Sequence, residues 1–181
     1  MMTTPMTLQH VVVKIPVDGD LGVEPGELIP VFHRWVATQA MPELLVDVAD
    51  LRHVPAGPGV ILVGSEADYS LDHSGGEWGL QYRRKDVVDG SNVDRLMQAF
   101  GAARRACDRL EEEFPGRIRF SRSRGDVIIN DRALAPNTDE TLRSAMPDLE
   151  QFARSALGPG PVEVTPHAGD PRRRFGARIS K

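Results

Sequence analysis

The sequence predicts a single α+β domain in which a mainly antiparallel or mixed β-sheet carries three principal helices packed on it. Three observations lead to this prediction. An alternating pattern flanks a glycine-rich turn within residues 66–83, three segments place apolar residues at helical spacing, and short loops join consecutive strands. A length of 181 residues fits one domain, so we assign residues 1–181 to a single unit.

The clearest local pattern is the hairpin at residues 66–83. Apolar and polar residues alternate on both sides of the turn at residues 73–76, which is typical of two half-buried antiparallel strands. A loop confined to these four residues predicts three apolar pairs across the strands: Leu71 with Trp78, Tyr69 with Leu80, and Ala67 with Tyr82. The polar face then pairs Glu66 with Arg83.

The three helices are predicted from their apolar stripes and from the residues at their starts. Pro30 suits the first turn of a helix, because its missing N–H has no partner there in any case. Ser91 and Asp94 form a variant of the capping box before the longest helix. Asn137, followed by Glu140, is the predicted cap of the third helix.

The remaining short apolar runs predict strands. Besides the hairpin, we expect them at residues 8–16, 43–51, 60–63, 117–120, 126–133, 162–165 and 175–180. The resulting order is a helix followed by two strands, repeated three times from about residues 29, 92 and 138, with the hairpin added to the first unit. The three units share no residue pattern, so the repetition concerns element order alone.

Composition indicates a soluble cytoplasmic protein, and we expect a bacterial source. The chain is 40% hydrophobic and 27% charged, which is ordinary for a soluble protein. Its N-terminus lacks the basic start and apolar run of a signal peptide, and no segment approaches the roughly 20 apolar residues of a membrane helix. The single cysteine, Cys107, excludes an internal disulfide and lies on the apolar stripe of the longest helix, where we expect it to be buried and inert.

Charge is distributed unevenly along the chain. Residues 1–80 contain 11 acidic residues and three basic ones, a net charge of −8, so the overall charge of −4 leaves +4 for residues 81–181. The two halves can attract each other within one molecule or across a two-fold axis, and we expect a homodimer. The pI of about 5.7 and the lack of aromatic residues among the basic ones argue against a nucleic-acid partner.

Two groups of residues are candidates for ligand binding. His33, Asp50, His53 and Tyr69 combine the side chains of an acid–base or metal site, and a fold that gathered them would form a small-molecule pocket. The alternative for Asp50 and His53 is hydrogen bonding at a strand end, and for His33 a position at the border of the core.

Arginines near residue 120 are the best candidates for anion binding, because the guanidinium fork matches carboxylates and phosphates. They are Arg117, Arg119, Arg122 and Arg124. The alternative is a solvated strand face. The run Arg172–Arg174 is interpreted as a solvated loop beside Asp170.

No pattern for a metal, cofactor or catalytic nucleophile is present in the sequence. We therefore expect no cofactor and no metal, and enzymatic activity stays open. The leading hypothesis is a non-catalytic module that self-associates or binds a partner. The alternative is a small-molecule-binding protein or an enzyme whose site contains His33, Asp50, His53 and Tyr69.

Overall fold

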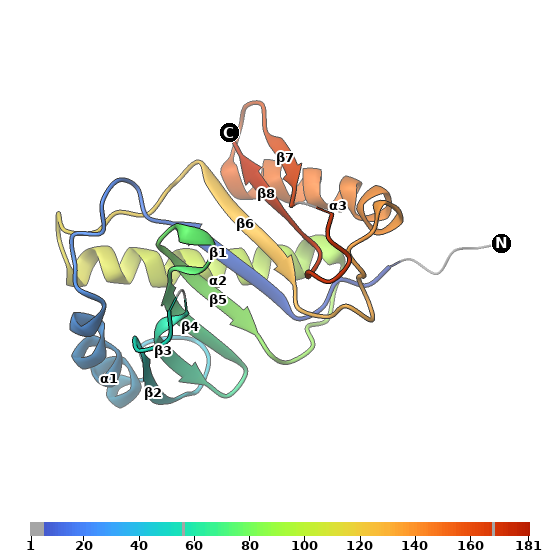
Figure 1. Ribbon diagram of the computed structural model, residues 1–181. Coiled ribbons are helices and arrows are strands. Elements are labelled where there is room, and N and C mark those ends of the chain that lie inside the picture. Colours follow the sequence, from blue (N-terminus) through green and yellow to red (C-terminus); the bar gives the residue numbers. More distant parts are fainter. Residues whose placement is uncertain (1–5, 56, 168) are drawn as a thin grey trace.

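One eight-stranded antiparallel sheet forms the centre of the protein in the computed structural model, which describes residues 6–55, 57–167 and 169–181 (Figure 1). The strand order across the sheet is β2-β3-β4-β5-β1-β6-β8-β7. In chain order the strands are β1 (Val11–Pro16), β2 (Leu45–Leu51), β3 (Gly59–Gly64), β4 (Ala67–Asp72), β5 (Gly79–Arg84), β6 (Arg124–Ile129), β7 (Glu163–Pro166) and β8 (Gly176–Ser180).

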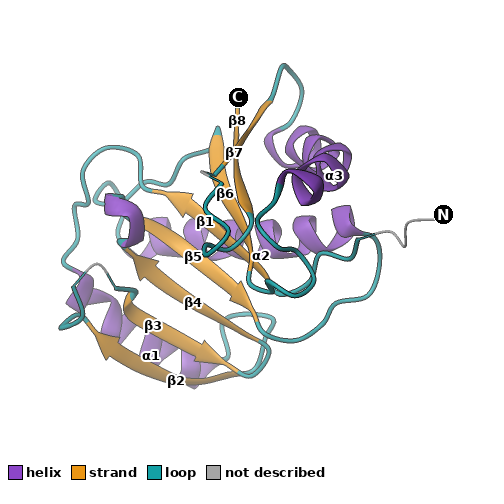
Figure 2. Ribbon diagram, turned by 45° about the vertical axis from the view of Figure 1, so that its right-hand side comes forward, coloured by secondary structure: helices purple, strands orange, loops and turns teal. Residues whose placement is uncertain are grey.

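Three helices pack on one face of this sheet (Figure 2). They are α1 (Leu28–Thr38), which lies on β2 and β3, α2 (Asn92–Glu113), which lies on β1 and β5, and α3 (Asp139–Leu157), which contacts α2, β7 and β8. Two short 3-10 turns, η1 (Pro25–Glu27) and η2 (Ser74–Gly76), complete the regular structure. None of the described helices is both long enough and apolar enough to cross a membrane.

The α+β class and the three principal helices are therefore confirmed, but the predicted repeat of helix, strand and strand is wrong. Strand β1 precedes every helix, as predicted, but α2 is followed by the single strand β6 and not by two strands. The segment after α2 that was expected to form a strand contributes only an isolated bridge between Phe120 and Val17. Phe120 is buried there, so its apolar character reflects core packing and not a further strand.

The hairpin is formed by β4 and β5, with a register two residues from the predicted one. Its pairs include Leu71 with Leu80, Tyr69 with Tyr82, and Asp68 with Arg83. The connection is longer than expected because η2 occupies it, with Gly75 and Gly76 at positive φ. A shift of two residues keeps the side chains on their predicted faces, since side chains in a strand alternate with a period of two. The polar side of β4 is buried as well, at Asp68, Ser70 and Asp72, so this strand is not half-buried as predicted.

Helix starts follow the predicted capping chemistry in two of three cases. Ser91 and Asp94 form the reciprocal capping box of α2. The cap of α3 is Thr138, whose side chain accepts a hydrogen bond from the N–H of Thr141, and not Asn137. Helix α1 begins two residues ahead of Pro30 and keeps this proline in its first turn, where its missing N–H is harmless.

Alternation along the strands separates an apolar face from a polar one. On β1, Val11, Val13 and Ile15 point into the core beneath the helices, whereas Lys14 points to the opposite side. We call this opposite side, which no described helix covers, the helix-free face. This face is the candidate region for a binding site, because several polar side chains are buried on it. They are Lys14, Asp68, Ser70, Asp72 and Asp126.

Candidate functional site: a polar tract on the helix-free face

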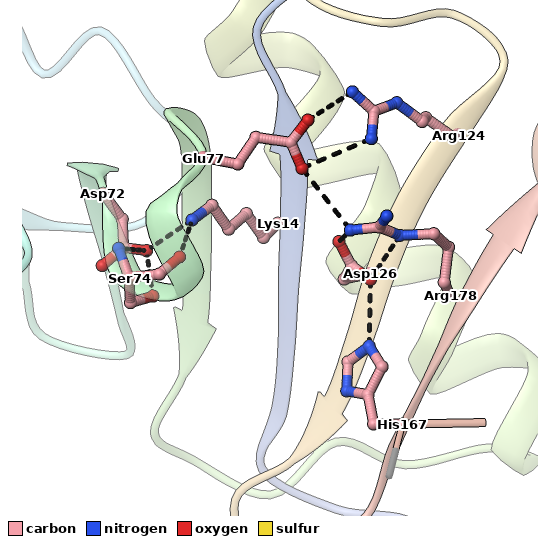
Figure 3. Close-up of polar contacts among 8 residues, drawn as sticks. All are labelled: Lys14, Asp72, Ser74, Glu77, Arg124, Asp126, His167 and Arg178. Atoms are coloured by element: carbon pink, nitrogen blue, oxygen red, sulfur yellow. Dashed lines mark hydrogen bonds and ion pairs between the residues drawn. The ribbon is translucent and has the colours of Figure 1, made fainter. Parts of the chain in front are cut away.

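An ion-pair cluster occupies the middle of the helix-free face (Figure 3). Asp126 on β6 accepts a hydrogen bond from Nε2 of His167 at 2.9 Å. Arg178 on β8 holds the same carboxylate with two N–H groups, at 3.0 Å through Nε and 2.9 Å through Nη2. Arg178 lies opposite Asp126 in the register of β6 and β8, so the sheet itself brings the two side chains together.

Asp126 keeps its negative charge in this setting. Burial alone would raise the pKa of its carboxyl group, but the hydrogen bonds from His167 and Arg178 outweigh burial and leave the pKa below its ordinary value. The aspartate therefore provides His167 with a fixed anionic partner, an arrangement that orients imidazole rings in many catalytic and binding sites.

Gly176 provides the space in which the ring of His167 lies. A Cβ atom at position 176 would come within 2.9 Å of Nδ1 of His167 and within 2.6 Å of the carbonyl oxygen of Val127. The backbone N–H of His167 also donates to the carbonyl of Gly176 at 3.0 Å. The backbone hydrogen bond to Gly176 and the side-chain contact with Asp126 therefore fix His167, and the missing side chain of Gly176 leaves room for its ring.

Three further ion pairs extend the cluster across the face. Glu77, in the connection before β5, accepts from Arg124 of β6 and lies 3.5 Å from Nη2 of Arg178. Lys14 of β1 donates to Asp72 of β4 at 2.8 Å, and both side chains are buried. Acids and bases from both halves of the chain therefore neutralise one another on this face.

Next to the cluster is a hollow of about 530 Å³, which we call the arginine pocket. Its lining consists of Ile128, Asn130, Arg132, His167, Arg172, Arg173 and Arg174. Two smaller hollows on the same face adjoin it, and the side chain of Arg174 borders all three. The arginine pocket is thus one end of a polar trough.

The four arginines of the pocket have no carboxylate partner among the residues that the structure describes. Arg132 donates to the backbone carbonyl of Arg172 at 3.0 Å, and Arg174 donates to the side-chain oxygen of Asn130 at 3.0 Å. The nearby acids Asp131 and Asp170 instead accept hydrogen bonds from backbone N–H groups. Several positive charges consequently border one hollow without an internal counter-ion.

The four residues proposed for a dispersed ligand site lie in different surroundings. His33 is exposed on α1, and His53 is exposed in the connection after β2. Asp50 forms an exposed ion pair with Arg52 at 2.7 Å, and hydrogen bonds from Arg52 lower its pKa to about 2. Tyr69 is fully buried on β4, where its hydroxyl group bonds to Glu43. None of the hollows described above contains any of the four.

The arginines proposed for anion binding mostly have acidic partners. Arg117 forms a two-pronged pair with Glu27, and Arg122 bridges Asp108 and Glu111. Arg124 is the one that lies on the helix-free face, where it pairs with Glu77. Arg119 is exposed and forms no ion pair within the described part of the chain.

The described residues contain no group of three histidine, cysteine or acidic side chains that could hold a metal ion. Comparison with protein-family models, curated proteins and solved structures gave no significant match. A function must therefore be inferred from the geometry of the polar tract.

Sequence reasoning missed this tract because its members are far apart in the chain. Lys14, Asp126 and Arg178 each occupy an ordinary polar position in an alternating strand. Only the strand order, which places β6 between β1 and β8, brings them together. The local signals are Arg124, an anion-binding candidate that lies in the tract, and the run Arg172–Arg174, which the sequence predicts to be a solvated loop.

Proposed function

We propose that this protein binds a small anionic molecule in the arginine pocket. The observation that carries the proposal is the convergence of Arg132, Arg172, Arg173 and Arg174 on one hollow without a carboxylate partner in the described structure. Guanidinium groups recognise carboxylates and phosphates through paired N–H donors. An anion bound here would receive several such donors at once.

The surrounding acids strengthen this interpretation, because they are already engaged. Asp126 is held by His167 and Arg178, and Glu77 is held by Arg124 and Arg178. They therefore contribute little free negative charge to repel an incoming anion. The amide group of Asn130 adds a neutral polar group at the edge of the pocket.

The dimensions favour a small molecule over a macromolecule. A volume of about 530 Å³ lies within the usual range of roughly 300–1,000 Å³ for small-molecule sites. We accordingly propose a ligand with a phosphate or carboxylate group, and not a nucleic acid. This corresponds to the small-molecule class of function that the sequence left as an alternative, at a different set of residues.

The test is calorimetric titration with inorganic phosphate, sulfate and citrate at constant ionic strength. We expect saturable binding, and an affinity at least tenfold lower in a variant that carries both Arg173→Ala and Arg174→Ala. The matched control carries Arg105→Ala and Arg109→Ala, which remove two exposed arginines of α2 away from the pocket. Binding that is weakened equally in both variants, or not detected in the wild-type protein, would refute the proposal.

Self-association is a second candidate function, which the edge of the sheet favours. Strand β2 is an edge strand, and Leu44 and Val46 at its start are 60% and 56% exposed. An edge with unpaired backbone groups and exposed apolar side chains is suited to pairing with a second copy of the chain. We therefore retain a cytoplasmic bacterial homodimer as a proposal, independent of the arginine pocket.

A further inference from the structure

We propose that His167 contacts the anion bound in the arginine pocket and takes up a proton when the anion binds. This inference rests on the proposed function and adds a specific chemical role to one residue of that site. It follows from the fixed orientation of the imidazole ring, from the free ring nitrogen and from the charges that surround the ring.

The orientation of the ring leaves one nitrogen available. Nε2 faces the carboxylate of Asp126 at 2.9 Å, and a carboxylate accepts hydrogen bonds, so Nε2 carries hydrogen in both protonation states. Nδ1 has no hydrogen-bond partner among the described residues, while the side chain borders the arginine pocket. In the neutral ring Nδ1 presents a lone pair, which repels an anion such as sulfate. In the charged ring it presents an N–H donor instead.

The surrounding contacts oppose a rotation of the imidazole ring that would place Nδ1, in place of Nε2, against Asp126. Arg178 fixes the carboxylate of Asp126 with two hydrogen bonds, and the backbone of His167 is bonded to Gly176. A rotation that brought Nδ1 to Asp126 would give up this geometry. The histidine is therefore a preorganised donor once it is protonated.

Charged groups face His167 from each neighbouring element. Asp126 on β6 and Asp139 at the start of α3 favour the protonated ring. Arg178 on β8 and the four arginines of the pocket disfavour it. The adjoining hollow also contains Lys14, which is paired with Asp72, and Glu77, which is paired with Arg124 and Arg178. An anion among the arginines would offset their positive charge and accept from Nδ1, so anion binding and protonation favour each other reciprocally.

The arrangement also predicts which anions depend on this proton. Sulfate has no proton to donate over the range in which histidine titrates, so it requires the charged ring. A phosphate group that keeps one proton can donate it to the neutral Nδ1 and still bind. Affinity for sulfate should consequently fall more steeply with rising pH than affinity for phosphate.

The experiment measures sulfate binding by calorimetry between pH 5.5 and 8.5, in pairs of buffers that differ in ionisation enthalpy and so report proton uptake. We expect the affinity of the wild-type protein to fall as pH rises, approaching roughly tenfold per pH unit at the upper end, with uptake of up to one proton. His167→Asn should show a flat profile and no proton uptake. His33→Asn, which changes an exposed histidine on α1, should behave as the wild-type protein does.

The outcomes separate this inference from the proposed function. Sulfate binding with a flat profile, a steep profile that persists in His167→Asn, or phosphate binding without any sulfate binding would overturn the role of His167 and leave the pocket intact. Failure of sulfate, phosphate and citrate to bind at any pH would overturn both. The NMR signals of the His167 ring provide a second readout, because added sulfate should increase its protonated fraction at a fixed pH.

Discussion

The hydroxyl group of Tyr69 donates a hydrogen bond of 2.6 Å to the carboxylate of Glu43, and both side chains are buried. The same carboxylate accepts from Tyr82 at 3.1 Å, and Gln98 of α2 donates to the Tyr82 hydroxyl at 3.0 Å. Burial, reinforced by the neighbouring Glu43, raises the pKa of Tyr69 far above its ordinary value, so its hydroxyl group keeps its proton. This network ties the segment before β2 to the centre of the sheet and to α2.

Replacing Glu43 by alanine should lower the free energy of unfolding by roughly 2–5 kcal/mol, because two buried hydroxyl groups lose their acceptor. Urea denaturation of Glu43→Ala, Tyr69→Phe and the double variant measures the coupling. We expect the double variant to lose less than the sum of the single losses. Strict additivity would contradict a shared network.

The buried pair of Lys14 and Asp72 should contribute more to stability than exposed pairs do. Lys14→Met leaves the carboxylate of Asp72 without its cation, and we expect a loss of about 3–5 kcal/mol in chemical denaturation. The control is Arg52→Ala, which breaks the exposed pair with Asp50 and should cause little or no change. Equal losses in the two variants would show that the burial of Lys14 has no energetic importance.

Asp126 should make the protein sensitive to acid in a definite range of pH. Because its pKa in the folded state lies below the unfolded value, which is ordinarily about 3.9, its contribution is complete above that value. The contribution is lost as pH falls below about 4 toward the folded pKa. The difference in unfolding free energy between the wild-type protein and Asp126→Asn should therefore shrink over this range, and a constant difference would argue against the ion pairs.

Cys107 should react slowly with a thiol reagent in the native protein and rapidly after denaturation. Its side chain is fully buried on α2, and burial raises the pKa of the thiol well above its ordinary value, which suppresses the reactive thiolate. The rate of labelling is measured by absorbance with a chromogenic disulfide reagent. Fast labelling without denaturant would indicate that this part of the core opens readily.

Self-association predicts a mass twice that of the monomer by light scattering, at tens of micromolar protein and in both low and high salt. Persistence in high salt is expected because exposed ion pairs contribute only about 0.2–1 kcal/mol each, so apolar surface must supply most of the contact. Val46→Lys should yield the monomer by placing a charge on the exposed edge of β2. A monomer in both salts, or a dimer indifferent to this substitution, would contradict the proposed edge contact.

Local sequence patterns were sufficient for the parts of the fold that depend on neighbouring residues. The faces of the hairpin, the capping box at Ser91 and the burial of Cys107 were all predictable, because each depends on residues a few positions apart. The register of the hairpin was not, since it depends on the conformation of η2, and glycines permit more than one turn.

The site was less predictable for a related reason. Asp126 and His167 are 41 positions apart, and nothing in either segment indicates that they meet. Their contact depends on the pairing of β6 with β8 and on the space left by Gly176. Histidines and aspartates that look functional in sequence, such as His53 and Asp50, lie instead on exposed loops and strand ends.

The position of β1 also has a consequence for how the protein is made. This strand lies in the interior of the sheet, between β5 and β6, yet the ribosome synthesises it long before either neighbour. At a synthesis rate of roughly 5–20 residues per second, β5 is made several seconds after β1, and β6 later still. The apolar side chains of β1 have no strand partner during this time. Until β5 has also emerged from the ribosome, the nascent chain presents Val11–Pro16 as an unpaired strand, and this is the interval in which a chaperone would have most to protect.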